Sequence, residues 1–225
     1  FLRKYDNITF TNKFELSKVN EHLPNSNKTI ISNGISELKF LEIQSKINRV
    51  NRKNKNQKII ITYIGNVGLA QNLLTFINVV KNFNKYEFRI VGDGNDFKNI
   101  SNNILKNKIK NVKLIGRVKE NEVIKHYANT DLLYAKLEPK YYTAIPSKLY
   151  EYLSTGKPII YSGKGASVEL LKNFDNIFFI NSNKTSLENA LNKICFYFNS
   201  DKNVKIIQEN FIREKINLEL IKIIN

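Results

Sequence analysis

A short polar stretch around Lys148 and Glu151 holds the residue types best suited to chemistry in this sequence of 225 residues. Pro146 has the fixed φ of a first helical position and Gly156 suits a helix C-terminal cap, so residues 147–154 predict a helix. Lys148 and Glu151 are three residues apart and share a face near its start. A helix start with free amides and a lysine suits a phosphate, and a carboxylate one turn later suits sugar hydroxyls. The stretch therefore predicts a site for a nucleotide that carries phosphate and ribose.

A second candidate, Arg117, follows a short apolar run at residues 112–115. An arginine at the carboxyl end of a strand can hold a phosphate through two hydrogen bonds or stack on a base. The alternative is a surface arginine that pairs with Glu120 or Glu122.

A third candidate is the turn that contains Gly65, Asn66 and Gly68, between an apolar run and a helical pattern. Glycines there allow a ligand to approach the backbone closely. A plain tight turn is the alternative, because the dinucleotide-binding fingerprint requires a further glycine where this chain has Tyr63.

The elements that must position these residues alternate along the chain after residue 58. The apolar runs are residues 59–64, 88–91, 112–115, 132–135, 158–161 and 177–180, and the helical stretches are residues 69–83, 97–105, 120–128, 147–154, 167–174 and 187–198. Continuous apolar runs are typical of strands buried on both faces, and their alternation with helices predicts an α/β fold with a doubly wound parallel sheet. Ligands of such sheets bind beyond the carboxyl ends of the strands.

The two ends of the chain differ from this pattern. Residues 1–35 predict a strand at 7–10, a short helix at 14–19 and a strand at 28–32, closed by Asn33 and Gly34. This piece is too short for a core of its own, and we interpret it as the tail of a preceding domain followed by a linker. Residues 36–200 are expected to form the main domain and residues 201–225 a C-terminal helix, with one long amphipathic pattern over 204–223. Two placements of this helix remain open: it packs back on the sheet, or it crosses to the N-terminal domain. Because the chain begins at Phe1, we expect a fragment of a longer protein.

The composition limits the possible function classes. The net charge of +16 could attract nucleic acid, anionic lipid or phosphorylated substrates, although the lysines are scattered and a compositional bias explains most of them. Cys195 has no partner for a disulfide and is expected to be a small core residue in a cytoplasmic protein. The sequence contains no spaced Cys/His set for zinc and no serine in a nucleophile elbow, so neither a zinc site nor a serine hydrolase is expected.

The order of these motifs resembles one known family. The motifs are Gly65-Asn66-Val67-Gly68, Val91-Gly92-Asp93-Gly94, Gly116-Arg117-Val118 and Pro146-Ser147-Lys148-Leu149-Tyr150-Glu151, followed by Gly156-Lys157-Pro158. From about residue 58 onward the chain resembles the C-terminal, donor-binding domain of GT-B glycosyltransferases, specifically glycosyltransferase family 4. The Gly-Asn-Val-Gly and Pro-Ser-Lys variants of these motifs look like those of the bacterial branch that builds O-antigen and capsule. The resemblance implies that residues 36–200 are a Rossmann-like domain for a nucleotide sugar.

The resemblance also implies roles for single residues. Glu151 matches the glutamate that holds the ribose hydroxyls of the donor. The helix start at Ser147, Lys148 and Leu149 matches the part that faces the diphosphate and the donor sugar. The phosphate-side loop corresponds to Gly65, Asn66 and Gly68, and the strand end beside the base to Arg117 and Val118.

Three departures from the family pattern change the expected chemistry. Thr143 stands where an acid often contacts the donor sugar, and Pro146 replaces a glycine that supplies a backbone donor. Asn66 and Gln71 are neutral where many members carry Arg and Lys to neutralise the diphosphate. Lys148 and Arg117 are the obvious replacements, and we expect them to be the catalytic cations.

The activity implied is transfer of a sugar from a nucleotide sugar, with UDP as the expected nucleotide, with retained configuration and with neither a cofactor nor an obligatory metal. The acceptor, a glycan or a lipid-linked glycan, would bind the preceding domain, so the fragment alone is expected to be nearly inactive. Peripheral contact with the inner face of the cytoplasmic membrane is compatible with the charge. Two alternatives remain open: a nucleotide-sugar epimerase of GT-B architecture, and a basic nucleic-acid-binding module that uses Lys140, Tyr141 and Tyr142, although no nucleic acid is expected.

Overall fold

The computed structural model describes residues 7–20, 22, 27–47, 58–181, 184–193 and 200–224. Its strands are β1 (Asn7–Phe10), β2 (Asn27–Ile30), β3 (Ile59–Ile64), β4 (Tyr86–Val91), β5 (Val112–Gly116), β6 (Leu132–Lys136), β7 (Ile159–Ser162) and β8 (Ile177–Phe179). Its α-helices are α1 (Lys13–Asn20), α2 (Glu37–Lys46), α3 (Leu74–Val80), α4 (Phe97–Lys106), α5 (Glu120–Ala128), α6 (Lys148–Ser154), α7 (Ala166–Leu171), α8 (Lys184–Lys193), α9 (Asp201–Asn210) and α10 (Arg213–Ile224). A 3₁₀ turn, η2 (Pro139–Tyr141), follows β6.

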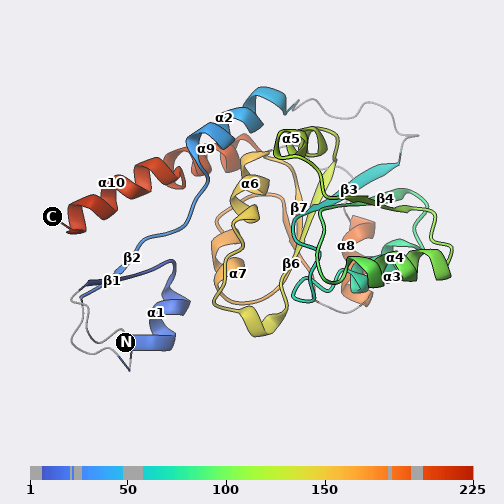
Figure 1. The fold of residues 1–225 in the computed structure, drawn as a ribbon, viewed down its shortest axis with the longest axis horizontal. Coiled ribbons are helices and arrows are strands. Elements are labelled where there is room, and N and C mark those ends of the chain that lie inside the picture. Colours follow the sequence, from blue (N-terminus) through green and yellow to red (C-terminus); the bar gives the residue numbers. More distant parts are fainter. Residues whose placement is uncertain are drawn as a thin grey trace.

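The main domain is built on a six-stranded parallel sheet in the order β5-β4-β3-β6-β7-β8 (Figure 1). The chain enters at β3, runs outward to β5, returns to β6 beside β3 and then runs outward to β8. This confirms the predicted α/β fold with a doubly wound, Rossmann-like sheet. The strand order reverses between β3 and β6, which is where ligands bind in folds of this kind.

Both faces of the sheet are buried, which explains why its strands appear in the sequence as continuous apolar runs. Along β6, Leu132 and Tyr134 pack on one face and Leu133 on the other. Helices α3, α4 and α8 cover the first face, and α2, α5, α6, α7 and α9 cover the second. Helix α6, which carries Lys148 and Glu151, therefore belongs to the second layer.

Helix α3 begins later than the sequence predicts. The hydrophobic pattern indicates a helix over 69–83, but residues 69–71 form a turn and the helix begins at Leu74. Leu69 is 69% exposed, the Gln71 side chain bonds back to the Gly68 amide, and Asn72 has a left-handed φ of 40°. These local features interrupt helical geometry although the apolar period continues.

The predicted single helix over 204–223 is wrong, because the segment forms two helices, α9 and α10. The break lies at Phe211 and Ile212, where Ile212 forms a parallel bridge with Ile35. The Ile35 amide donates to the Phe211 carbonyl, at 2.9 Å, and the Arg213 amide donates to the Ile35 carbonyl, at 2.8 Å. A Cβ on Gly34 would lie 2.3 Å from the Phe211 oxygen, so this close crossing requires a glycine. Helix α2, which the sequence analysis did not predict, follows directly.

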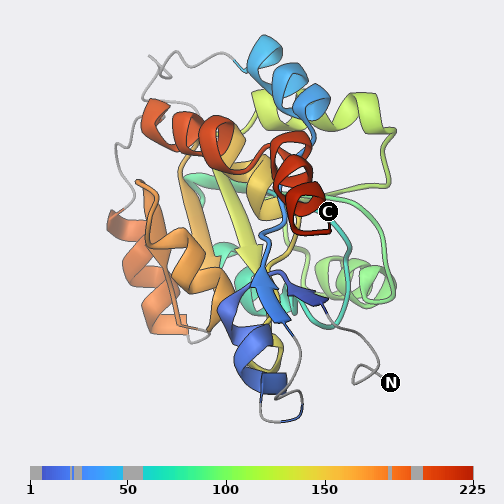
Figure 2. The same ribbon diagram turned by 90° about the vertical axis from the view of Figure 1, so that its left-hand side faces the viewer.

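The N-terminal residues form a small unit in which β1 and β2 pair in parallel and α1 connects them (Figure 2). The predicted strands and short helix are thus present. One other prediction, the core position of Cys195, falls at residues 194–199, outside the described residues. Within the described part of the chain, no helix is long and apolar enough to cross a membrane.

Candidate functional site

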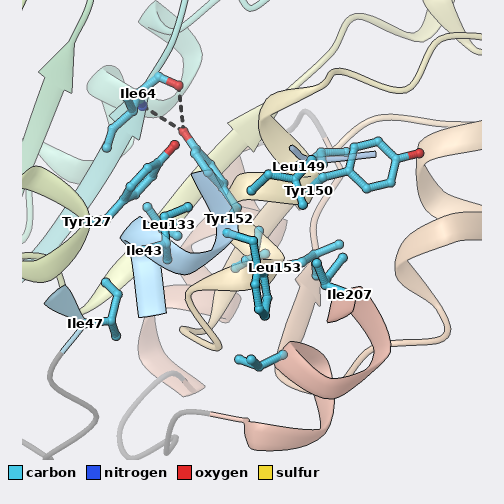
Figure 3. Packing of buried hydrophobic residues seen from close by; sticks show 14 of the residues in the cluster. Ile43, Ile47, Ile64, Tyr127, Leu133, Leu149, Tyr150, Tyr152, Leu153 and Ile207 are labelled. Atoms are coloured by element: carbon cyan, nitrogen blue, oxygen red, sulfur yellow. Dashed lines mark hydrogen bonds between the residues drawn. The ribbon is translucent and has the colours of Figure 1, made fainter. Parts of the chain in front are cut away.

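The switch point between β3 and β6 is closed by a tyrosine from α6. β6 pairs with β3 only at Ile61 and Thr62, so the last residue of β3, Ile64, has no strand partner on that side. The Ile64 amide donates to the Tyr152 hydroxyl, at 2.7 Å, and that hydroxyl donates to the Ile64 carbonyl, at 3.1 Å (Figure 3). Tyr152 thereby fixes α6 against the end of the central strand.

The glycine turn after β3 is joined to the turn after β4 by backbone hydrogen bonds. The Gly65 amide donates to the Val91 carbonyl, and the Val67 amide donates to the Asp93 carbonyl. A Cβ on Gly92, whose φ is +134°, would lie 1.9 Å from the Gly65 oxygen. The two turns therefore form one rigid edge whose shape depends on glycine.

The glycine turn after β3 carries no charged side chain that could face a phosphate. Asn66 is exposed, and its carbonyl accepts a hydrogen bond from the buried Tyr63 hydroxyl. The Gly68 amide, a predicted phosphate donor, is buried and donates to the Gln71 Oε1 at 3.2 Å. A ligand at Gly68 must displace the Gln71 side chain.

The start of α6 is close to the predicted position. Pro146 is not the first helical residue, since α6 begins at Lys148 with Ser147 as its N-cap. The Leu149 amide donates to the Pro146 carbonyl at 3.0 Å and so is not free, and the Leu149 side chain is fully buried. The predicted C-terminal cap is present, because Gly156 has a left-handed φ of +69°.

Lys148 and Glu151 contact each other directly. The Lys148 Nζ lies 3.0 Å from both carboxylate oxygens of Glu151, and the Tyr127 hydroxyl of α5 donates to the same carboxylate at 3.0 Å. The Glu151 side chain is 17% exposed and the Lys148 side chain 36%. Burial, and next the neighbouring Glu151 carboxylate, raise the pKa of Tyr127 well above its usual value, so the hydroxyl remains a donor. The cluster thus presents one cation and one oriented carboxylate at the helix start.

The Arg117 segment is not joined to this cluster by any hydrogen bond or ion pair among the described residues. Arg117 is exposed at the end of the edge strand β5, and it forms neither of the ion pairs given as its alternative. Glu120 lies near Lys39, and Glu122 accepts from the Lys119 amide. Val118 packs against the core cluster that contains Leu149 and Tyr127, so the segment lies on the α6 side of the sheet.

Sequence reasoning missed a buried charge pair beside the switch point. Lys136, at the end of β6, has a side chain that is 1% exposed, and its Nζ lies 3.1 Å from the Glu138 carboxylate. That Nζ also contacts the Asn72 carbonyl and the Thr75 hydroxyl, while the Asn72 amide group donates to Glu138. The sequence did contain a signal for this pair: a lysine ends the apolar run of β6, and a glutamate follows two residues later. The pair fixes the loop after β6 to the turn before α3.

Metal ligands do not gather in the described residues: no three His, Cys, Asp or Glu side chains there lie close enough to hold an ion. The Tyr141 and Tyr142 side chains after β6 are about 40% exposed, and the Lys140 Nζ lies 5.2 Å above the Tyr141 ring.

Comparisons with known proteins place this arrangement in a family. A sucrose-phosphate synthase from Thermosynechococcus elongatus has a TM-score of 0.79 and 15% identity, over 99% of this chain and 58% of that chain. The Anabaena protein Alr3699/HepE, solved in complex with UDP and glucose, has a TM-score of 0.75 and 14% identity, over 97% of this chain and 62% of that chain. A glycosyltransferase from Rickettsia africae has a TM-score of 0.75 and 14% identity, over 99% of this chain and 64% of that chain.

These likenesses show a shared fold, and this chain spans less than two thirds of the length of each of the three structures. A search of curated protein sequences found no match. The family Glycosyl transferases group 1 matches residues 44–210, which is well over half of the chain and includes every site residue discussed above. The chain therefore belongs to the group 1 glycosyl transferases.

Proposed function

We propose that this chain is the donor-binding part of a retaining glycosyltransferase of family 4. It moves a sugar from a UDP-sugar to a glycan or lipid-linked acceptor in the synthesis of a bacterial surface polysaccharide such as O-antigen or capsule. The observation that carries the proposal is the Lys148–Glu151–Tyr127 cluster, which lies at the start of α6 in a chain of this family. Among similar structures, Alr3699/HepE was solved with UDP and with UDP-glucose.

The cluster suggests how a nucleotide sugar is held. In the free protein, Lys148 and Glu151 form an ion pair with each other. Binding exchanges this ion pair for one new ion pair and a set of hydrogen bonds: the Lys148 ammonium moves to the diphosphate, and the Glu151 carboxylate accepts from the ribose hydroxyls. Tyr127 keeps the carboxylate in place during the exchange, because its hydroxyl remains bonded to Glu151. A nucleotide without ribose hydroxyls would gain the contact of its diphosphate with Lys148 but not the hydrogen bonds to Glu151.

The same groups assist departure of the diphosphate. Negative charge develops on the leaving group as the glycosidic bond breaks, and fixed donors near that charge lower the barrier. Lys148 supplies a cation, and the amides of Ser147 and Lys148 have no acceptor among the described residues. Arg117, exposed and on the same side of the sheet, supplies the second cation or stacks on the base. Asn66 and Gly65 line the phosphate side.

The reaction is proposed to need no obligatory metal, because the cations and helix amides named above neutralise the leaving group. Donor binding that persists in excess EDTA supports this, and a strict dependence on Mg²⁺ or Mn²⁺ contradicts it.

The test is a calorimetric titration of the chain with UDP, GDP and ADP, beside the variant Glu151→Ala. We expect saturable binding of UDP, a much weaker response to the other two, and loss of binding in the variant. Glu188→Ala, which removes a carboxylate from α8 on the opposite face of the sheet, is the matched control and should bind UDP like the unaltered chain.

Two results contradict the proposal. One is the absence of binding of any nucleoside diphosphate, both by the chain and by the full-length protein. The other is equal binding of UDP by Glu151→Ala and the unaltered chain, which would place the nucleotide elsewhere.

A further inference from the structure

The small N-terminal unit touches the loop that leads into α6. Two contacts join the unit to the loop and a third joins it to the neighbouring helix α7, although these segments are far apart in the chain. The Asn12 Nδ2 donates to the Thr143 carbonyl at 2.9 Å, and the Phe14 ring meets the Tyr142 ring edge-on with centroids 6.5 Å apart. The Lys13 Nζ lies 2.9 Å from the Glu169 carboxylate of α7, but both side chains are about half exposed. An exposed ion pair contributes little, so the first two contacts define the junction.

Asn12 uses both ends of its amide group. Its Oδ1 accepts from the amides of Phe14, at 2.9 Å, and Glu15, at 3.2 Å, which caps the start of α1. Its Nδ2 reaches out of the unit to Thr143. The residue is only 9% exposed, so the hydrogen bond to Thr143 is shielded from water. One side chain thus fixes α1 and attaches it to the loop.

The loop is held from its other side by α7. The Ala166 amide donates to the Tyr142 carbonyl at 2.7 Å, and the Ser167 hydroxyl donates to the Ala144 carbonyl at 2.7 Å. Thr143 lies between these two anchored residues, and its carbonyl is the one that Asn12 holds. The carbonyls of three consecutive residues are therefore fixed, a few residues before Ser147.

We propose that Asn12 is a positioning residue for the donor site. Its hydrogen bond to Thr143 sets the path of the loop into α6, so that Lys148 and Glu151 face the nucleotide only when the N-terminal unit is seated on the loop. Binding of the nucleotide and contact of the N-terminal unit with the loop then favour each other, because each stabilises the same path of the loop into α6. This inference rests on the proposed function for its ligand, UDP.

The test uses variants that separate the two ends of the Asn12 amide. Asn12→Asp and Asn12→Ser both retain an oxygen that caps α1. Neither replaces the hydrogen bond to Thr143, because the aspartate carboxylate has no donor and the serine side chain is shorter than the amide. The two variants differ in charge, so a shared effect is not electrostatic. Lys18→Ala, on an exposed position of α1, changes the net charge by the same amount as Asn12→Asp and is the matched control.

A spectroscopic reporter distinguishes seating from general stability. The chain contains no tryptophan, so Phe14→Trp introduces a single one at the junction. We expect UDP to shift the tryptophan emission to shorter wavelength, with the same midpoint as the calorimetric titration. Addition of Asn12→Ser should move the emission of the free protein to longer wavelength, while the circular dichroism spectrum stays the same.

Both Asn12 variants should bind UDP roughly fivefold more weakly than the unaltered chain, on the scale of one lost hydrogen bond, and Lys18→Ala should bind normally. Binding within twofold of normal in both Asn12 variants overturns the inference and leaves the proposed function intact. Failure of both the unaltered chain and the full-length protein to bind any nucleoside diphosphate overturns the proposed function, and the positioning role falls with it.

Discussion

The two segments that flank the proposed donor site, the turn after β3 and the start of α6, are held in shape in different ways. The turn after β3 is made of glycines and neutral side chains, and its polar groups are bonded internally, as the Gly68 amide is to Gln71. The start of α6 carries charge, and its cation and carboxylate are held by each other and by Tyr127. The first segment is a rigid surface, whereas the second is a charged pair that can exchange partners.

This difference indicates that the two segments would contribute differently to nucleotide binding. A diphosphate needs cations or aligned amides, and the neutral turn supplies neither while Gln71 occupies Gly68. Under the proposed function, the charge is therefore expected from Lys148 at the helix start and from Arg117. Substitutions in the turn should act through folding or through access to its amides, and substitutions at the helix start should act through affinity.

The largest effect is expected at Gly92. In Gly92→Ala the new Cβ would lie 1.9 Å from the Gly65 oxygen, so the two turns must separate. We expect a loss of at least about 3 kcal/mol in the free energy of unfolding, measured with urea. Gly116→Ala is the control: its φ is also positive, but nothing lies within 4 Å of its Cβ, so it should lose only about 1 kcal/mol. Equal losses would show that the turns are not packed as described.

At the helix start, Lys148→Met should weaken UDP binding about tenfold with little change in stability, because it removes one charge-assisted hydrogen bond to the diphosphate. The affinity of the variant should also depend less on salt. Lys205→Met, on an exposed position of α9, removes the same charge from another part of the protein and should have no effect. An unchanged affinity in Lys148→Met would assign the phosphate to another cation.

Gln71→Lys should act in the opposite direction. It frees the Gly68 amide and adds a cation beside it, so UDP binding should strengthen roughly threefold to tenfold in calorimetry. Gln71→Ala frees the Gly68 amide without adding a cation, so it separates the contribution of the amide from that of the added charge. Weaker binding in Gln71→Lys would mean that the phosphate does not approach the turn.

The smallest effect is expected at Tyr127. Tyr127→Phe removes the hydroxyl that donates to Glu151, and we expect UDP binding to weaken about twofold to threefold, within the range for one hydrogen bond. Because burial and Glu151 raise the pKa of this hydroxyl, the ratio of the two affinities should be constant from about pH 6 to pH 9. A ratio that changes across this range would show that the hydroxyl titrates.

The sequence predicts the main domain well because its strands are buried on both faces. The bounds of β3 and α5 agree with the prediction, since β-branched runs and a regular helical period determine them locally. The signal for α2 was also present: Ser36 is its N-cap, and Phe40, Ile43 and Ile47 recur at helical spacing and are buried. A helical pattern so close to the linker was not recognised.

Other features depend on contacts that sequence spacing does not contain. The break between α9 and α10 arises from pairing with Ile35, which is distant in the chain. The Lys148–Glu151 pair is local and could be predicted, but the third member of the cluster, Tyr127, comes from another helix. Arg117 was predicted as a catalytic cation from its place at the end of a strand and from the order of the motifs. It remains a prediction, since no hydrogen bond or ion pair among the described residues joins it to the cluster.

The bridge between Ile35 and Ile212 has a mechanical consequence. The segment that leaves the N-terminal unit and the bend before α10 are tied at one point, where the Arg213 guanidinium also donates to the Gly34 carbonyl at 3.0 Å. The exit of the N-terminal unit and the base of the twelve-residue helix α10 therefore share one anchor, so neither can shift at this point without breaking the bridge or carrying the other along.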